Sequence, residues 1–515
     1  MDVETEVVIA GAGPTGLTLA YELALAGVET LVLEKLPRRV EQVKGGTIQP
    51  RTAELLELRG LLEPMLRRAL PRERVGSHFA MLPVPLDCTP WQTRHPYPIS
   101  IPQWEVEEVL EERATARGAR IRRGAAVTEV SGSGEGVTVS ADGLRVRARY
   151  LVACDGGRST VRKFLGLPFP GRLGNGLAVL ADVRLSATSS LVPTRLGHIS
   201  DLTRQVNGYW AMLVPVGGDR YRLTFGREDE AETTRDTPVT HEEIAAALRA
   251  VYGEETVLSG VDNASRFTDA TRQVERYRVG DVLFAGDAAH IHTPLGGQGL
   301  NTGVQDAFNL GWKLAATIQG RAPDGLLDTY HAERHPVGAR VLHHTSAQRV
   351  LADLRPNEDV AALRDIFADL LRLPEANRHL AGLMSGLSLR YDLPGEHPLT
   401  GCRMRDADLL TDAGPTRVSA LFGDGHAVLL DLAGIVPSGL RPPSGVDAVR
   451  AESATDLGAA ALLVRPDGYV CWAADDAATC DATLPAAIDR HLATVPTGMY
   501  DAVGGHQGTT DRERA

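Results

Sequence analysis

The chain has 515 residues and a mass of 55.2 kDa, which at roughly 100–200 residues per domain allows two or three domains. Its hydrophobic share of 43 %, charged share of 23 % and mean hydropathy of −0.12 are ordinary for globular proteins, and they exclude disordered, collagen-like and fibrous classes. The formal net charge of −12 and the pI of about 5.7 argue against binding to nucleic acid or to an anionic membrane surface.

The cysteines and the N-terminus indicate the cellular compartment. The five cysteines are odd in number and include no CxxC pair, so neither a disulfide framework nor a zinc site is expected. The N-terminus carries acidic residues where a secretory signal carries basic ones, and no stretch approaches about eighteen uninterrupted apolar residues. We therefore expect a cytoplasmic protein without a membrane or nucleic-acid partner.

The N-terminal segment is predicted to form a strand, a glycine-rich turn, a helix and a second strand. Val7–Ala10 is a β-branched run, GAGPTG (Gly11 to Gly16) follows it directly, and the next helix ends at Gly27. Thr30–Leu33 is the second strand, and Glu34 finishes it. This order is the context that a dinucleotide fingerprint requires; the alternative is a structural glycine turn with a surface glutamate.

The positions of the GAGPTG turn have separate roles in binding a pyrophosphate. Gly11 allows the tight turn, Gly13 lets backbone amides approach the phosphates, and Gly16 permits close packing of helix on strand. The helix N-terminus adds partial positive charge. Glu34 can accept hydrogen bonds from two ribose hydroxyls and disfavours a 2′-phosphate, so the site suits FAD or NAD better than NADP.

Two more glycine-rich segments follow predicted buried strands. The strand Tyr150–Ala153 ends in CDGGRST (Cys154 to Thr160), where Asp155 can reach a cofactor or a visiting nicotinamide. The strand Asp281–Ala285 continues into GDAAHIHTPLGGQGLNTG (Gly286 to Gly303), where Asp287 can accept hydrogen bonds from a ribityl chain.

In the last of these segments, Pro294 sets an extended turn, and Gly296, Gly297, Gln298 and Gly299 present backbone amides where the next helix begins. We expect these amides and the helix dipole to face negative charge, such as that at the N1–C2=O edge of a reduced flavin.

The remaining sequence alternates between helical and strand patterns. Val106–Arg117 is predicted to be helical, and Val127–Val130 and Val137–Ser140 are predicted to pair as a hairpin. Residues between about 175 and 275 alternate as an antiparallel sheet does. After about residue 395 a small α/β domain is expected, with strands at Ala459–Val464 and Gly468–Trp472 around a tight turn.

Several other residues have two interpretations. His290 and His292 could suggest a metal, but no third ligand is evident, and loop histidines near a cofactor are favoured. The His343–His344 pair is expected on a solvated helix face. Four residues of the middle sheet could line a substrate pocket or pack in the sheet core: Trp210, Met212, Tyr221 and Phe225.

GAGPTG with Glu34, CDGGRST with Asp155 and GDAAHIHTPLGGQGLNTG with Asp287 resemble the three signatures of the class A flavin-dependent aromatic hydroxylases, the group of p-hydroxybenzoate and phenol hydroxylases. The resemblance covers about residues 5–345. Within the group it is greatest to hydroxylases of angucycline, anthracycline and tetracycline-type aromatic polyketides and to rifampicin monooxygenases. LLVRPDGYVCWA (Leu462 to Ala473) resembles their thioredoxin-like C-terminal domain, which lacks the redox cysteines.

The resemblance implies an α/β fold in three parts. An FAD-binding Rossmann-like domain of the GR2 type would comprise residues 1–175 and 276–395, and an antiparallel-sheet substrate domain would comprise residues 176–275. Residues 396–503 would form the thioredoxin-like domain, and residues 504–515 are predicted to be a disordered tail. We expect a monomer or a homodimer.

The resemblance also assigns contacts to individual positions. Thr15 and Lys35 would lie along the pyrophosphate and adenosine, Gln103 would hold the cofactor, and Val127 would meet the adenine through its backbone. Lys44 stands where relatives usually carry an arginine, and it keeps the positive charge. The full set of predicted cofactor-binding residues is Gly11, Gly13, Pro14, Thr15, Gly16, Glu34, Lys35, Lys44, Gln103, Val127, Asp155, Thr160, Asp287, Pro294, Gly297, Gln298, Gly299, Leu300 and Asn301.

Members of this group use NADPH or NADH to reduce non-covalently bound FAD; O₂ then adds at flavin C4a, and the hydroperoxide delivers its distal OH to an electron-rich ring. The resemblance therefore implies an FAD-dependent monooxygenase of antibiotic biosynthesis that hydroxylates a polycyclic phenolic substrate, an aromatic polyketide. No catalytic side chain and no metal ligand is predicted, because the cofactor carries the chemistry. The alternatives are Baeyer–Villiger oxygenation, inactivation of an antibiotic, and a flavin-binding protein that is not an oxygenase.

Overall fold

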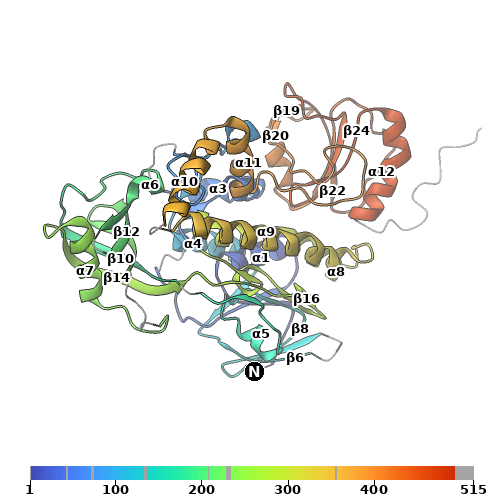
Figure 1. Ribbon diagram of the computed structural model, residues 1–515. Coiled ribbons are helices and arrows are strands. Elements are labelled where there is room, and N and C mark those ends of the chain that lie inside the picture. The colour runs from blue at the N-terminus through green and yellow to red at the C-terminus, as the bar shows by residue number, and fades with distance from the viewer. Residues whose placement is uncertain are drawn as a thin grey trace, which may run out of the picture.

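The computed structural model describes residues 2–41, 45–70, 75–132, 134, 136–174, 176–206, 208–227, 234–353 and 357–492. Figure 1 shows a large central domain, a green sheet domain on one side of it and an orange-to-red C-terminal domain on the other. Lys44 and the predicted tail at residues 504–515 lie outside the described residues.

The large domain is built on a sheet whose central strand is buried on both faces. Among the described residues this sheet has eight strands, in the order β16-β17-β8-β1-β2-β5 with β7 paired to β8 and β6 to β7. Val7, Val8 and Ile9 are fully buried, as is typical of parallel strands covered by helices. The strands are β1 (Asp2–Ala10), β2 (Thr30–Glu34), β5 (Arg120–Arg123), β6 (Val127–Gly132), β7 (Val137–Ala141), β8 (Leu144–Ala153), β16 (Arg278–Val279) and β17 (Val282–Phe284).

Helix α1 (Pro14–Leu25) follows β1 directly and packs against α4 (Gln103–Ala116) and α8 (Gln298–Ile318). Proline in its first turn favours the start of the helix, and Gly27 beyond its end has a φ of +77°. The predicted strands and helices of this part of the chain are confirmed, with α4 starting at Gln103 rather than Val106. The other helices here are α2 (Pro50–Leu58), α3 (Leu62–Leu66), α5 (Thr160–Phe164), α9 (Thr329–Leu351), α10 (Glu358–Leu371) and α11 (Pro374–Ser385).

The middle sheet is antiparallel, as predicted, and its described strands run in the order β11-β12-β13-β10-β14. Helix α7 (His241–Tyr252) covers one face, and Tyr221 and Phe225 pack in the core beneath it. Trp210 and Met212 alternate with the buried Ala211 of the same strand and therefore point to the opposite face. The strands are β10 (Leu177–Ala187), β11 (Thr203–Val206), β12 (Tyr209–Gly217), β13 (Arg220–Arg227) and β14 (Val257–Thr268).

The C-terminal domain is a mixed sheet with one long helix packed against it. Its described strands run in the order β20-β19-β22-β21-β23-β24, with β21 and β22 parallel and the other pairs antiparallel. The two strands predicted around the tight turn are confirmed. All five cysteines lie in the described ranges and are free. The elements are β19 (Asp408–Thr411), β20 (Gly414–Arg417), β21 (Ala427–Asp431), β22 (Val446–Glu452), β23 (Ala461–Val464), β24 (Val470–Ala474) and α12 (Ala477–His491).

No helix within the described ranges has both the length and the apolar character needed to cross a membrane.

Short strands complete the fold and tie loops of the large domain together. They are β3 (Thr47–Ile48), β4 (Ile99–Ser100), β9 (Gly171–Arg172), β15 (Thr271–Gln273) and β18 (His290–Ile291).

The prediction of a solvated His343–His344 pair is wrong for one of its members. His343 is exposed, but His344 is 6 % exposed, and its Nδ1 lies 3.1 Å from Nε2 of Gln348. The sequence pattern missed this burial because α9 is covered by neighbouring elements on more than one side. Burial lowers the pKa of His344 to about 3.

This buried histidine should make the protein sensitive to acid. Unfolded histidine takes up a proton near pH 6.5, whereas folded His344 stays neutral down to about pH 3, so between these values the unfolded state binds more protons. The free energy of unfolding should therefore fall with pH by up to about 1.4 kcal/mol per unit below pH 6.5 on account of this residue. Urea titrations between pH 7 and 4 should give a shallower dependence for His344→Gln than for His343→Gln; equal slopes would contradict the assignment.

Candidate cofactor site

Four predicted site segments come together at one edge of the eight-stranded sheet. The GAGPTG turn follows β1, Glu34 ends β2, Asp155 follows β8, and Asp287 follows β17. These four strands run parallel to one another. Their carboxyl ends therefore meet at one edge, where ligands bind in open α/β sheets.

The three glycines of the GAGPTG turn differ in what surrounds them. A Cβ on Gly11, whose φ is +106°, would lie 2.4 Å from the carbonyl oxygen of Cys154, and a Cβ on Gly16 would lie 2.1 Å from that of Gly11. A Cβ on Gly13 would meet no atom of the described residues within 4 Å. Packing therefore requires Gly11 and Gly16, whereas the protein leaves open space at Gly13, beside the first-turn amides of α1.

Glu34 is held in place by the backbone. Its Oε2 accepts a hydrogen bond from Ala12 N at 2.8 Å, and its Oε1 accepts one from Leu36 N at 2.9 Å. The carboxylate is half-buried beside the turn, and its remaining lone pairs are free for a ligand. Ala125 N donates to the carbonyl oxygen of Glu34, which brings the start of β6 at Val127 close by, while Lys35 is exposed.

Asp155 caps the helix that follows it. Its Oδ2 accepts hydrogen bonds from Thr160 N at 2.6 Å and Val161 N at 3.1 Å. Its Oδ1 is buried and has no hydrogen-bond partner among the described residues. One oxygen of this carboxylate is therefore structural, and the other can accept a hydrogen bond from a ligand.

Thr15 joins the first glycine-rich segment to the third. A Cβ on Gly286 would lie 2.6 Å from Thr15 Oγ1, and one on Gly303 would lie 2.2 Å from the same atom. Both glycines are therefore required for Thr15 to fit between the start of α1 and helix α8.

The first turn of α8 presents its backbone rather than its side chains. Gly297 caps the helix with a φ of +63° and is exposed, as is Pro294 before it. Gln298 donates from Nε2 to the carbonyl oxygens of Met384 at 2.8 Å and Gly296 at 3.2 Å, so its side-chain nitrogen is occupied and its backbone N–H remains for a ligand.

The exposed Asp287 lies beside the next residue of this turn. A Cβ on Gly299 would approach only Asp287 Oδ1 and His292 Nε2, each at 3.7 Å. Space therefore remains beside Gly299. His292 Nε2 is buried without a hydrogen-bond partner among the described residues.

Gln49 is a residue of this region that the sequence analysis missed. Gln49 N donates to Asn301 Oδ1 at 2.7 Å, and Gln49 Nε2 donates to the carbonyl oxygen of Gly296 at 2.9 Å. The side chain is 2 % exposed, and its Oε1 has no partner in the described part of the chain. A polar residue directly before a helix-initiating proline was the available signal.

Residues 45 and 46 lie close to three elements: the start of α4, the first turn of α8 and strand β13 of the middle sheet. A Cβ on Gly45 would lie 3.3 Å from Gln103 Oε1 and 3.8 Å from Leu300 Cβ, so these two predicted residues lie near each other. A Cβ on Gly46 would lie 3.1 Å from Arg222 Nη1, which comes from the middle sheet. The face of the middle sheet opposite α7 therefore meets the large domain close to the start of α8.

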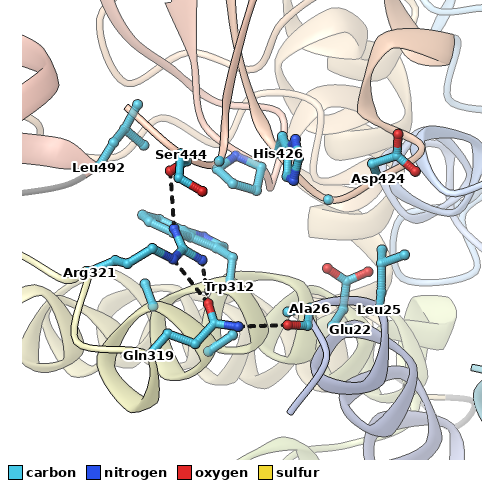
Figure 2. A pocket seen from close by; sticks show the side chains of 15 residues that line it. Glu22, Leu25, Ala26, Trp312, Gln319, Arg321, Asp424, His426, Ser444 and Leu492 are labelled. Carbon is cyan, nitrogen blue, oxygen red and sulfur yellow. Dashed lines mark hydrogen bonds between the residues drawn. The ribbon is translucent and has the colours of Figure 1, made fainter. Parts of the chain in front are cut away.

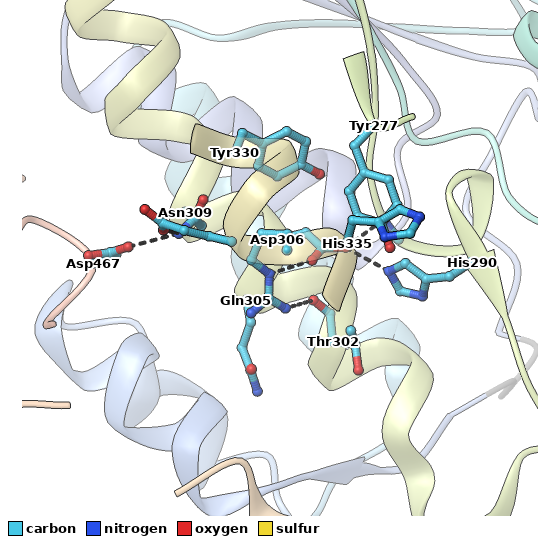
Figure 3. A network of polar contacts seen from close by, with 12 residues as sticks. Tyr277, His290, Thr302, Gln305, Asp306, Asn309, Tyr330, His335 and Asp467 are labelled. Carbon is cyan, nitrogen blue, oxygen red and sulfur yellow. Dashed lines mark hydrogen bonds and ion pairs between the residues drawn. The ribbon is translucent and has the colours of Figure 1, made fainter. Parts of the chain in front are cut away.

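His290 belongs to a buried polar network rather than to a metal site (Figure 3). Its Nε2 lies 2.8 Å from Asp306 Oδ2, and Asp306 Oδ1 accepts a hydrogen bond from Arg334 Nε at 2.7 Å. Burial by itself would raise the pKa of Asp306, but Arg334 and His290 lower it overall. Among the described residues no group of three or more His, Cys, Asp or Glu could hold a metal ion.

A cavity of about 410 Å³ lies away from this edge, between helices α1 and α8 and the C-terminal domain (Figure 2). Trp312, Gln319 and Arg321 line one side, and His426 and Ser444 line the other. None of the described residues predicted to bind the cofactor lines it. The cavity therefore marks the boundary between two domains.

Comparison with known families identifies the fold. The FAD binding domain family (FAD_binding_3) matches residues 4–345, and the C-terminal domain of aromatic-ring hydroxylases matches residues 397–494. The chain belongs to the flavin-dependent aromatic hydroxylases.

Relatives of this hydroxylase cover nearly the whole chain. A 12-dehydrotetracycline 5-monooxygenase/anhydrotetracycline 6-monooxygenase of Streptomyces rimosus is 48 % identical over 91 % of this chain and 95 % of its own. A rifampicin monooxygenase of Streptomyces venezuelae is 42 % identical over 93 % of this chain and 98 % of its own. A dialkyldecalin synthase of Streptomyces rugosporus is 40 % identical over 91 % and 96 %. The predicted resemblance to tetracycline-type and rifampicin enzymes is confirmed.

The fold of the hydroxylase is also that of solved structures. An anhydrotetracycline hydroxylase from Streptomyces rimosus superposes with a TM-score of 0.84 at 45 % identity, covering 95 % of this chain and 99 % of that one. The three-part architecture with its FAD-binding domain is therefore a shared one.

The residues of the hydroxylase fit FAD at the sheet edge. The open space at Gly13 lies where a pyrophosphate must approach the start of α1, and the Glu34 carboxylate lies beside it. The unpartnered Asp155 Oδ1 offers an acceptor to the hydroxyl groups of the cofactor. The individual contacts of the predicted residues with FAD stay predictions.

Replacing Glu34 by alanine should weaken FAD binding much more than it weakens the fold. Loss of a charge-assisted ribose contact is worth about 1.5–3 kcal/mol, or roughly 10- to 150-fold in Kd. Water can replace the carboxylate at the two backbone amides, because the side chain is only half-buried. Fluorescence titration with FAD and urea unfolding of the FAD-free protein measure the two effects.

The surface variant Glu29→Ala, at the opposite end of β2, is the control for Glu34→Ala, with an expected change in stability within about 0.5 kcal/mol and an unchanged Kd. A Glu34→Ala protein that is less stable but binds FAD as the wild type does would make Glu34 a purely structural residue.

Proposed function

We propose that this hydroxylase uses NADPH or NADH and O₂ to insert one oxygen atom into a polycyclic phenolic substrate of the aromatic polyketide type. The observation that carries the proposal is the convergence of four motif segments around the open space at Gly13, in a chain related over most of its length to tetracycline monooxygenases. FAD, when bound, supplies the redox chemistry that activates O₂.

The protein's own part in this proposal is to bind and orient. The first-turn amides of α1 and the Glu34 carboxylate would hold the adenosine diphosphate half of the cofactor. The first-turn amides of α8, which follow Gly297, would face the ring half and stabilise negative charge there. Their donors are backbone groups fixed by the helix, so they need no rearrangement when charge develops.

The substrate would lie against the open face of the middle sheet. Trp210 and Met212 point to this face, and Arg222 brings it next to Gly46, close to Leu300 at the start of α8. Aromatic and thioether side chains suit a flat polycyclic ring system. The nicotinamide donor would visit the same region, because GAGPTG is the one GxGxxG segment that follows a predicted strand in the sequence.

Mass spectrometry under ¹⁸O₂ tests this proposal. Purified protein with FAD, NADPH or NADH and a panel of polycyclic phenols should oxidise the nicotinamide faster when the substrate is present. The product should gain one ¹⁸O atom. Nicotinamide oxidation that no substrate stimulates, with no labelled product, would overturn the proposal.

A second candidate function is that of a flavin-binding enzyme that adds no oxygen. It is supported by a 40 % identical relative that is named as a synthase, a dialkyldecalin synthase, and not as a monooxygenase. In the same experiment that enzyme would give a product of unchanged mass without consuming NADPH or NADH. If the substrate has antibacterial activity and the oxygenated product lacks it, the reaction would instead be inactivation of an antibiotic; a relative named as a rifampicin monooxygenase keeps this outcome in the test.

A further inference from the structure

The turn between β23 and β24, residues Arg465 to Gly468, is inserted into the large domain; we call it the hairpin tip. Arg59 Nη2 donates to the carbonyl oxygen of Pro466 at 2.9 Å, and Arg51 Nη2 donates to that of Asp467 at 3.1 Å. Arg465 is 2 % exposed and Asp467 is 1 % exposed. The tip is therefore a buried contact between two domains, not a surface turn.

Charged side chains of the tip meet helices α8 and α9. Both terminal nitrogens of Arg465 donate to the Glu333 carboxylate of α9 at 2.8 Å, and Asn309 Nδ2 of α8 donates to Asp467 Oδ2 at 3.2 Å (Figure 3 shows the second contact). Lys313 Nζ of α8 lies 2.9 Å from Glu333 Oε2. Two cations and two anions thus form one buried cluster.

Glu333 is followed in α9 by Arg334, which faces the cofactor edge. Arg334 binds Asp306 of α8 through Nε and donates from Nη2 to the carbonyl oxygen of Thr302 at 3.2 Å. Asp306 Oδ2 accepts a hydrogen bond from Gly286 N at 3.1 Å and lies 2.8 Å from His290 Nε2. Asp306 therefore holds both ends of the loop Gly286–His290, which carries Asp287.

A second contact runs from the hairpin to Arg334. Tyr469, directly after the tip, packs against Tyr391 with ring centroids 4.4 Å apart. Arg334 Nη1 donates to the hydroxyl of Tyr391 at 3.1 Å, and the Arg465 guanidinium lies 5.3 Å from the centroid of the Tyr391 ring. The hairpin therefore contacts Glu333 directly and Arg334 through Tyr391.

Buried ion pairs of this kind fix geometry more than they add stability. Apolar side chains of the same volume are often at least as stabilising as a buried ion pair, but they lack the short, directional contacts that define one relative position of two domains. Burial by itself would raise the pKa of Glu333, but Arg465 and Lys313 hold it well below its usual range. Glu333 therefore stays charged at neutral pH.

We propose that the hairpin tip of the C-terminal domain positions the cofactor-facing loop Gly286–His290, acting through Glu333 and Arg334 on Asp306. This inference rests on the proposed function only in that the loop faces the cofactor. It gives the C-terminal domain, which has no redox cysteine pair, a role in the site of another domain. Glu333, Arg334 and Asp306 are positioning residues in this scheme.

The chain offers a matched pair of variants to test this. Glu333→Gln removes a carboxylate that is 9 % exposed and pairs with Arg465 of the C-terminal domain and Lys313 of the large domain. Glu54→Gln removes one that is 7 % exposed and pairs with Arg403 and with Arg51, which itself contacts the hairpin tip. This control therefore disturbs a charged contact at the same boundary and beside the tip, but Glu54 makes no ion pair to α8 or α9 among the described residues and lies off the route through Glu333.

Both variants should lose stability in urea, but only Glu333→Gln should change the loop. In full-length, FAD-free protein, hydrogen exchange of peptides from residues 286–301 should be at least about fivefold faster for Glu333→Gln and unchanged for Glu54→Gln. The Kd for FAD should rise about tenfold for Glu333→Gln and less than threefold for Glu54→Gln. Equal effects of the two variants on exchange and on Kd would overturn the proposal.

A double-mutant cycle tests the route. Asp306→Asn alone should also raise the Kd for FAD, and adding Glu333→Gln should raise it little further, because both changes release the same loop. Independent, multiplying effects would overturn the route through Arg334. The exchange measurement needs no cofactor, so it distinguishes failure of this inference from failure of the wild type to bind FAD or to oxygenate.

Discussion

Replacing Gly13 by valine is expected to abolish FAD binding while the FAD-free protein keeps its fold. Gly13 has a φ of −80°, which any residue adopts, and a Cβ there would meet no described atom within 4 Å. A valine side chain would fill the space through which a pyrophosphate reaches the first-turn amides of α1. Losing two or more charge-assisted hydrogen bonds, at about 1.5–3 kcal/mol each, corresponds to at least a hundredfold rise in Kd.

Gly16→Val is the matched control for Gly13→Val. Its Cβ would lie 2.1 Å from the carbonyl oxygen of Gly11, so this variant should lose the fold itself. Thermal melts of the FAD-free proteins and FAD titrations separate the two cases: the Tm of Gly13→Val should stay within a few degrees of wild type. A Gly13→Val protein that binds FAD normally would show that the cofactor does not approach the turn.

Replacing Gly299 by valine is expected to uncouple nicotinamide oxidation from product formation. The residue lies in the first turn of α8, where backbone N–H groups would face the cofactor ring. A side chain there would hold the ring away from these donors and admit water. We expect most of the NADPH consumed to appear as hydrogen peroxide, with product formation reduced about tenfold or more, since one lost donor of this kind costs about 10²- to 10³-fold in rate.

The fold should tolerate this change, because a Cβ on Gly299 would approach only Asp287 and His292, at 3.7 Å, and valine favours a helix over glycine. Gly303→Ala, whose Cβ would lie 2.2 Å from Thr15 Oγ1, should instead lower the Tm. Peroxide released per NADPH oxidised is measured beside the Tm of each FAD-free variant. A lowered Tm with unchanged coupling for Gly299→Val would assign this glycine to packing alone.

The local parts of the fold were predictable because their causes are local. The strands around GAGPTG, the hairpin after Val127 and the C-terminal strands follow from the periodicity of apolar residues and the positions of glycines. The alternation of residues between about 175 and 275 also predicted that the middle sheet is antiparallel. It did not predict helix α7, which covers one face of this sheet, and so it left Tyr221 and Phe225 undecided between core and pocket until the structure put them in the core.

Contacts between distant segments depended on packing that no local pattern encodes. Gln49 binds Gly296 and Asn301, about 250 positions further along the chain, and His344 is buried because other helices cover α9. The cluster of Glu333 with Arg465 joins two domains in the same way.

By itself, the sequence determined the strands, turns and helices around the three motifs and the edge at which the motif residues gather, because backbone geometry and parallel strand direction follow from residue type and spacing. Only the tertiary structure decided which glycines serve packing and which leave room for a ligand. The neighbours that make Gly11 and Gly16 obligatory but leave Gly13 open are brought there by the close packing of β1, β8 and α1, and such distances arise only when the elements are assembled.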